Sequence, residues 1–174
     1  FQTRPEVPVP DGVYLADFLT EKAVGFLQRH RDRPFFLYLS HFAVHSPHEA
    51  KAGLIEKFKS KPPAGGHHDP TYAAMIYSVD ESVGRVMAVL DELKLAGKTL
   101  LIFSSDNGGV GGYREIGGKG VTDNAPLRGG KGGESAVRRD ALVGQAGLLG
   151  LDGLQRGLQL APPQLLEGPL VLVP

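Results

Sequence analysis

Two short, continuous apolar runs separated by one long helical pattern constrain the fold of this chain more than any other feature. Residues 35–40 (FFLYLS) and 99–104 (TLLIFS) are bounded by chain breakers, which is typical of buried strands. Between them, residues 69–93 carry apolar side chains at helical spacing and begin with Asp as the N-cap, followed by Pro. Strand, helix and strand make the βαβ unit of a parallel sheet. We therefore predict an α/β fold with a mainly parallel central sheet and flanking helices, in which the two strands are adjacent or nearly so.

The remaining segments suggest one ordered domain and an unusual tail. Residues 13–31 repeat apolar side chains every three or four positions, which predicts a helix, and a short helix is expected around residues 54–58. Gly97 is the expected stop signal of the long helix. Residues 133–174 are dominated by Leu, Gly, Gln and Pro, a composition that a shifted reading frame would produce. We expect this tail to add no strand to the sheet and to form at most a short helix around residues 141–160.

Composition excludes several classes of function. The 174 residues contain 19 Lys and Arg and 19 Asp and Glu, so no global field attracts nucleic acid or an anionic membrane. The chain has no cysteine, which rules out disulfides and thiolate metal sites within it. No window approaches the roughly 20 apolar residues that span a membrane. Binding of an anion must therefore come from a local site.

A carboxylate and an amide follow the second predicted strand directly, as Asp106 and Asn107, and Gly108 comes next. Ligands of open α/β sheets bind at the carboxyl ends of the strands. Two such oxygen donors in that place are half of a site for Ca²⁺ or Mg²⁺. Asn-Gly is also a common turn dipeptide, so the spacing alone leaves both interpretations open.

Histidines and lysines supply further candidates. His41, His45 and His48 follow the first predicted strand, where one or two of them could hold an oxyanion or protonate a leaving group. The alternative is a loop with solvated histidines, which is also the expectation for residues 67–68. Lys119 and Lys131 each lie in a Gly-Gly-Lys-Gly stretch, where backbone amides and an ammonium group can approach an anion, or where two lysines are simply solvated.

Four segments, in order, resemble the type I sulfatases of the alkaline phosphatase superfamily. They are PFFLYLSHFAVHSP, DPTYAAMIYSVDESVGRVMAVLDEL, TLLIFSSDNGG and NAPLRGGKG. The resemblance covers residues 11–132, and it implies a partial alkaline-phosphatase-like α/β fold. By the same resemblance, Asp106 and Asn107 would be ligands of one Ca²⁺. His45 would contact the sulfate and the leaving-group oxygen, and Lys131 would neutralise the sulfate.

The same resemblance implies the activity and its limits. It implies hydrolysis of sulfate esters or sulfamates on a small molecule or glycan, by a formylglycine made from Cys or Ser, in an exported enzyme. The motif of that nucleophile, the paired N-terminal aspartates and the Gly-Lys-x-His segment do not occur in the 174 residues. We therefore expect residues 1–132 to be an internal part of the catalytic domain, inactive alone. There are two alternatives to a sulfatase fragment. One is part of a phosphatase or phosphodiesterase of the same superfamily, and the other is a truncated, inactive chain without a role. The substrate and the oligomeric state are not predicted.

Overall fold

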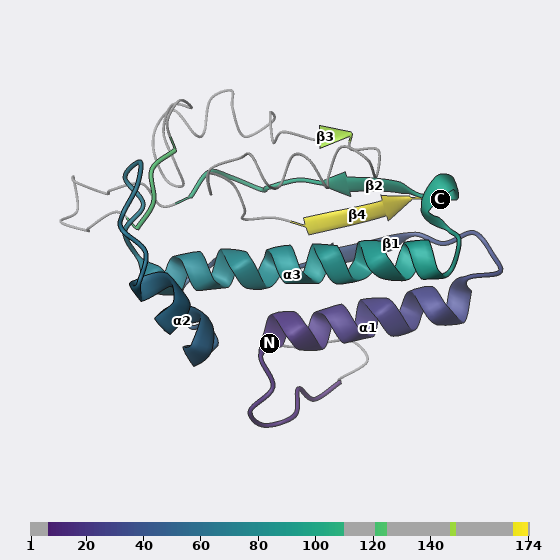
Figure 1. Ribbon diagram of the computed structural model, residues 1–174. Helices are drawn as coiled ribbons and strands as arrows, with labels where there is room; N and C mark the ends of the chain where they lie inside the picture. Colours follow the sequence, from purple (N-terminus) through teal and green to yellow (C-terminus); the bar gives the residue numbers. More distant parts are fainter. Residues whose placement is uncertain (1–6, 110–120, 125–146, 149–168, 174) are drawn as a thin grey trace.

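The computed structural model describes residues 7–109, 121–124, 147–148 and 169–173 (Figure 1). Helices α1 and α3 lie side by side along one face of a small sheet, and α2 lies near the beginning of α3. The elements are α1 Leu15–His30, β1 Leu37–Ser40, α2 Ala52–Lys59, α3 Pro70–Glu92, the 3₁₀ turn η1 Ala96–Lys98, β2 Leu100–Phe103, β3 Gly147–Leu148 and β4 Pro169–Val173. The predicted helices and both predicted strands are thereby confirmed, and the chain has the expected α/β class.

Helix α3 forms because its two ends and its apolar stripe agree. Asp69 caps it, since its Oδ1 accepts hydrogen bonds from the backbone N–H groups of Thr71 at 2.8 Å and Tyr72 at 3.0 Å. The helix ends before the predicted stop at Gly97. Lys94 takes the left-handed conformation, with φ 57°, and Gly97 lies inside η1. The chain therefore reverses one turn earlier than the glycine indicated.

The main core lies between the two long helices and the inner face of the sheet. Its buried residues come from α1, from β1 and the segment just before it, from α3 and from β2, and they are Ala23, Val24, Leu27, Phe35, Leu39, Val83, Val86, Met87, Val89, Leu90 and Leu101. The outer face of the sheet is open at Tyr38 and Leu100, which are 55% and 40% exposed. The alternation of burial along β1 matches the pleat, in which successive side chains point to opposite faces.

The sheet has the order β1-β4-β2-β3. Because β4 is antiparallel to both β1 and β2, those two strands run parallel to each other with one strand between them. The near-adjacent parallel arrangement is therefore confirmed. The hydrogen-bonded ladders of the described strands are nevertheless antiparallel, which the expectation of a mainly parallel sheet did not include.

The expectation that residues 133–174 add no strand is wrong. β4 pairs with β1 from Leu37↔Leu172 to Ser40↔Pro169, and with β2 over four residues. Its sequence, PLVLV, alternates Leu with β-branched Val, and its proline is the first residue, where the missing N–H is tolerated. A strand in the gap between β1 and β2 satisfies the backbone groups of both. The expectation rested on the composition of the whole tail, which did not single out these five residues. The helix expected around residues 141–160 lies outside the described residues.

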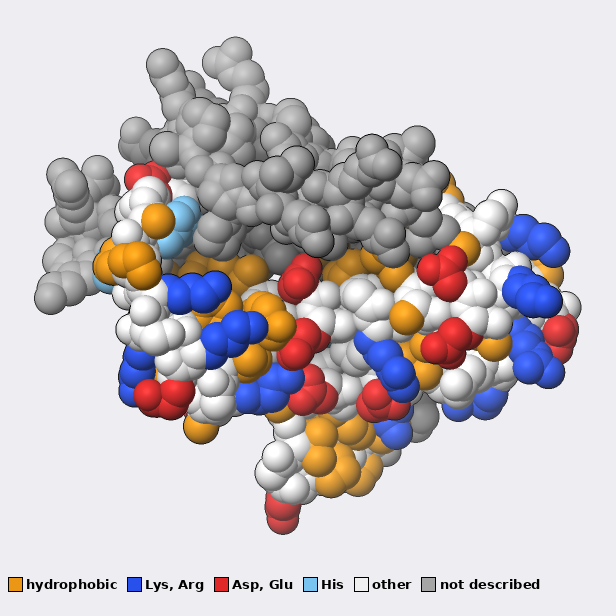
Figure 2. All heavy atoms as spheres, viewed as in Figure 1, with side chains coloured by type: hydrophobic (Ala, Val, Ile, Leu, Met, Phe, Trp, Pro, Cys, Tyr) orange, Lys and Arg blue, Asp and Glu red, His pale blue; other side chains and the backbone are white. Residues whose placement is uncertain are grey.

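Charged side chains of both signs are interspersed over the helical face of the molecule (Figure 2). This agrees with the equal numbers of acidic and basic residues. In the part of the chain that the structure describes, no helix is long and apolar enough to cross a membrane.

Candidate functional site

Two loops leave the sheet at the same edge. β1 ends at Ser40 and β2 at Phe103, and because the strands are parallel, the segments that follow them start at the same edge, with β4 between the two strands. A second core cluster joins these segments. Its buried residues come from the first loop and from α3, namely Ala43, Val44, Tyr72, Met75 and Val79, with Phe103 and Val121 packed against them. The edge that the sequence predicted as the site is therefore a packed structural unit.

The first loop places its three histidines in three different environments. His41 is largely buried, and its Nε2 lies 2.9 Å from Ser82 Oγ. Burial lowers the pKa of His41 from 6.5 to about 4, so its ring is neutral at pH 7. His48 contacts the Tyr72 ring edge to face, with 5.6 Å between the ring centroids. Only His45 is exposed.

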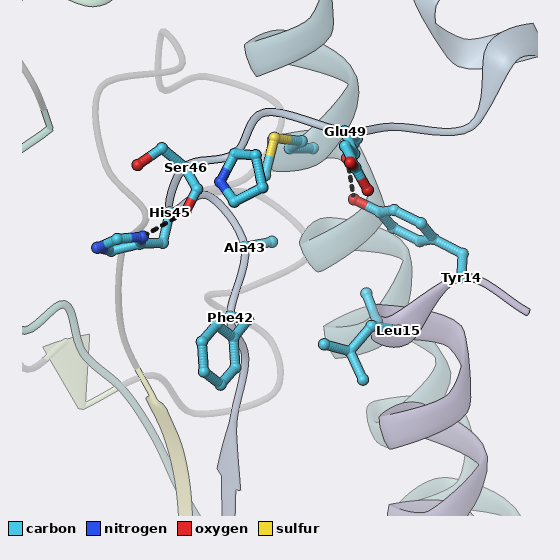
Figure 3. Close-up of a pocket in the computed structure, with 10 residues that line it drawn as sticks. Tyr14, Leu15, Phe42, Ala43, His45, Ser46 and Glu49 are labelled. Carbon is cyan, nitrogen blue, oxygen red and sulfur yellow. Dashed lines mark hydrogen bonds between the residues drawn. The ribbon is translucent and has the colours of Figure 1, made fainter. Parts of the chain in front are cut away.

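His45 is held in one tautomer when neutral. Its Nδ1 lies 2.7 Å from the carbonyl oxygen of Ser46, which can only accept, so Nδ1 carries the proton and Nε2 the lone pair. The backbone of His45 also donates a 2.8 Å hydrogen bond to the Phe42 carbonyl. In Figure 3 the imidazole points away from Tyr14 and Leu15, which line the far side of a pocket that is mostly apolar. His45 is therefore at the rim of this pocket, with Nε2 available for proton transfer.

The second loop brings together the two predicted oxygen donors. Asn107 Nδ2 donates to Asp106 Oδ1 at 2.6 Å, and Ser105 Oγ donates to the Asn107 carbonyl at 2.6 Å. Asp106 is exposed. One carboxylate and one amide fit Ca²⁺ chemically and supply part of the six to eight oxygens that it takes. Among the described residues no group of three or more His, Cys, Asp or Glu could hold a metal. The pair thus fits a partial site.

Residues 121–124, here called the strap, cross the second loop. Asn124 binds the backbone of Gly109 through both ends of its amide, at 2.9 and 2.8 Å. Thr122 Oγ1 lies 3.0 Å from His67 Nδ1, so His67 is tied into the structure and is not the solvated loop residue expected. Sequence reasoning missed these supports, although Asn124 opens one of the four family-like segments.

Two sequence-derived expectations remain untested at this edge. Lys119 and Lys131 lie outside the described residues. The convergence of His45 with Asp106 and Asn107 on one cleft stays a prediction, supported by the shared edge and the common core cluster.

The fold and the edge define an α/β protein that presents a histidine and a pair of oxygen donors beyond parallel strands. The chain belongs to the sulfatase family, whose model matches residues 2–147. It is 40% identical over 130 residues to the steryl-sulfatase of Mus musculus, which is 72% of this chain and 19% of that protein. It is 35% identical over 122 residues to the N-acetylgalactosamine-6-O-sulfatase of Bacteroides thetaiotaomicron, which is 67% of this chain and 22% of that protein.

Solved structures also resemble this chain. The crystal structure of Ps i-CgsB superposes with a TM-score of 0.58 and 26% identity, covering 95% of this chain and 29% of that one. The same values hold for Ps i-CgsB in complex with k-i-k-neocarrahexaose. The chain spans about a fifth of the length of the curated relatives named above.

Proposed function

We propose that this chain supplies one half of the active site of a sulfuric ester hydrolase. The observation that carries the proposal is the core cluster that packs the His45 loop, the end of β2 and the strap together at the carboxyl edge of the sheet. The substrate class is a sulfate ester on a small molecule or a glycan. Sulfatases of both kinds are among the relatives, by their names: a steryl-sulfatase and an N-acetylgalactosamine-6-O-sulfatase.

Each residue has a distinct task in this proposal. Asp106 and Asn107 would hold Ca²⁺ through their side-chain oxygens, and the bound ion would supply positive charge that stabilises a bound sulfate. His45, with Nδ1–H anchored on the Ser46 carbonyl, holds or delivers a proton at Nε2 for the leaving-group oxygen. Lys131 offsets the negative charge of the sulfate.

The nucleophile is not among these residues. A formylglycine would supply the attacking hydroxyl group, but no Cys/Ser-x-Pro/Ala-Ser-Arg motif occurs in the 174 residues. We therefore expect the 174-residue chain to bind Ca²⁺ weakly and to hydrolyse no aryl sulfate.

The proposal is tested by titrating the ¹⁵N-labelled chain with 4-nitrocatechol sulfate, with and without Ca²⁺. Amide shifts at the His45 loop and at residues 104–109 that require Ca²⁺ are the expected result. Asp106→Asn should abolish the Ca²⁺-dependent shifts, because it removes the only carboxylate of the pair. Asp91→Asn, an exposed change on the last turn of α3, is the matched control and should leave the shifts intact.

Three results would contradict the proposal in different ways. Shifts that avoid both loops would remove the site from this edge. Hydrolysis of the ester by the pure chain would show that a nucleophile is present after all. The corresponding phosphate ester, bound more tightly than the sulfate ester, would favour phosphatase chemistry.

A further inference from the structure

Asn124 makes an unusually complete contact with a single residue far away in the sequence. Its Oδ1 accepts from the Gly109 backbone N–H at 2.9 Å, and its Nδ2 donates to the Gly109 carbonyl at 2.8 Å. The two residues are 15 positions apart. A primary amide presents a donor and an acceptor side by side, so it can pair with both backbone groups of one residue as a neighbouring strand would. The contact closes the second loop with two hydrogen bonds.

The close approach depends on glycine at position 109. A Cβ added there would lie 2.5 Å from Thr122 Cγ2 and 2.8 Å from Tyr72 Oη, both too short for real contacts. Thr122 is 7% exposed, and Val121 packs against the second core cluster. The strap is therefore anchored independently of Asn124, and it offers the amide to Gly109 from a fixed position.

We propose that Asn124 is a positioning residue for the Asp106–Asn107 pair, an inference that rests on the proposed function. Gly109 follows Asn107 by two positions, and the intervening Gly108 adds backbone freedom that must be restrained if two oxygen donors are to keep one geometry. The strap restrains it from outside the loop. Asn124 also opens the segment that carries Lys131, so one side chain links the metal-binding loop to the segment of the proposed sulfate-binding lysine.

The test uses the full 174-residue chain, ¹⁵N-labelled, with two readouts. Hydrogen exchange at the Gly109 amide reports the contact directly, and the Ca²⁺ concentration at half-saturation of the residue 104–109 shifts reports its consequence. In Asn124→Ala we expect exchange at Gly109 to accelerate roughly tenfold and half-saturation to need several-fold more Ca²⁺. Asn124→Asp keeps the acceptor for the Gly109 N–H and loses the donor to the Gly109 carbonyl. Exchange of the Gly109 amide in this variant should therefore be faster than in wild type and slower than in Asn124→Ala.

Thr122→Val is the matched control on the strap. It removes the hydroxyl that contacts His67 and keeps the branched shape beside Gly109, so it weakens the general support of the strap and leaves the Asn124 amide in place. Both readouts should therefore change less than in Asn124→Ala. If Asn124→Ala unfolds the chain, Asn124→Asp and Thr122→Val still separate the amide contact from general support of the strap.

The outcomes distinguish this inference from the function beneath it. A wild-type chain without any Ca²⁺ response at residues 104–109 overturns the metal site, and with it the positioning role, whatever the exchange rates are. A wild-type chain that responds, beside an Asn124→Ala chain with the same half-saturation, overturns the positioning role alone. Slow, unchanged exchange at Gly109 in Asn124→Ala overturns the contact itself.

Discussion

The two loops at the carboxyl edge are held by different forces. The loop after β1 is anchored by apolar burial, since Val44 is 1% exposed and packs beside Met75 and Val79. The loop after β2 is half-exposed and is held by hydrogen bonds, chiefly from Asn124 to Gly109. The first loop therefore depends on side-chain volume, and the second depends on a distant segment and on the absence of a side chain. Disturbing one loop should leave the anchoring of the other largely intact.

Acid should disturb the first loop most. His41, at its beginning, contacts Ser82 and has its pKa lowered from 6.5 to about 4 by burial. The unfolded chain takes up this proton near pH 6.5 and the folded chain only near pH 4, so stability is full above about pH 6.5 and is lost as the pH falls. The whole difference corresponds to roughly 3 kcal/mol. Urea unfolding at pH 7, 5.5 and 4 measures it.

His41→Gln is the control for the acid effect, because carboxylates also contribute in this range. The variant keeps a polar group near Ser82 and removes the titration. Between pH 7 and pH 4, the free energy of unfolding of His41→Gln should fall less than that of wild type, by most of the roughly 3 kcal/mol attributed to His41. Equal falls in wild type and variant would refute the role of His41.

Removing volume from the first loop is the next largest effect. Val44→Ala should lower the free energy of unfolding by about 2 kcal/mol, because two buried methyl groups are lost and a cavity remains. Val13→Ala, at a position 42% exposed, should change it by less than about 0.5 kcal/mol. Denaturant unfolding of both variants measures the difference, and equal losses would mean that burial is not what holds this loop.

Adding one methyl group to the second loop tests the opposite dependence. Gly109→Ala places a Cβ against Thr122 and Tyr72, so the loop or the strap must move, at a cost of about 1 kcal/mol. Gly84→Ala, on the exposed side of α3 with nothing within 4 Å, should instead stabilise by up to about 1 kcal/mol. Thermal unfolding of the two variants measures these opposite changes in stability. A change of the same sign in both would contradict the close contact of Gly109 with Thr122 and Tyr72.

The smallest effect concerns the helix start that touches both loops. Tyr72 meets the ring of His48 and lies beside Gly109, and Asp69 caps the turn that carries it. Asp69→Ala should cost about 1 kcal/mol or less, whereas Asp91→Ala, near the negative end of the helix dipole, should be neutral or slightly stabilising. Chemical shifts at His48 and Gly109 should both move in Asp69→Ala, and a shift confined to one loop would contradict the shared support.

Local signals predicted much of this fold and part of the site. The cap at Asp69, the apolar stripe of α3 and the runs that became β1 and β2 each act over a few neighbouring residues, so they can be read from a window of sequence. The histidines show where local patterns fail: composition and spacing left His41, His45 and His48 as equal candidates, and only the resemblance to the family singled out His45. Their environments, with His41 largely buried and His45 exposed, were decided by packing. The role of Lys131 stays a prediction.

The sequence by itself determined the helices, the parallel relation of β1 and β2, and the family, because these follow from periodicity, chain breakers and motif order. Only the tertiary structure decided that β4 fills the gap between those strands, since a five-residue run that suits a strand still pairs only where two open ladders offer it partners. It alone decided that Asn124 meets Gly109. Contacts across 15 or more residues depend on where the whole chain has placed both ends, and no local pattern contains that information.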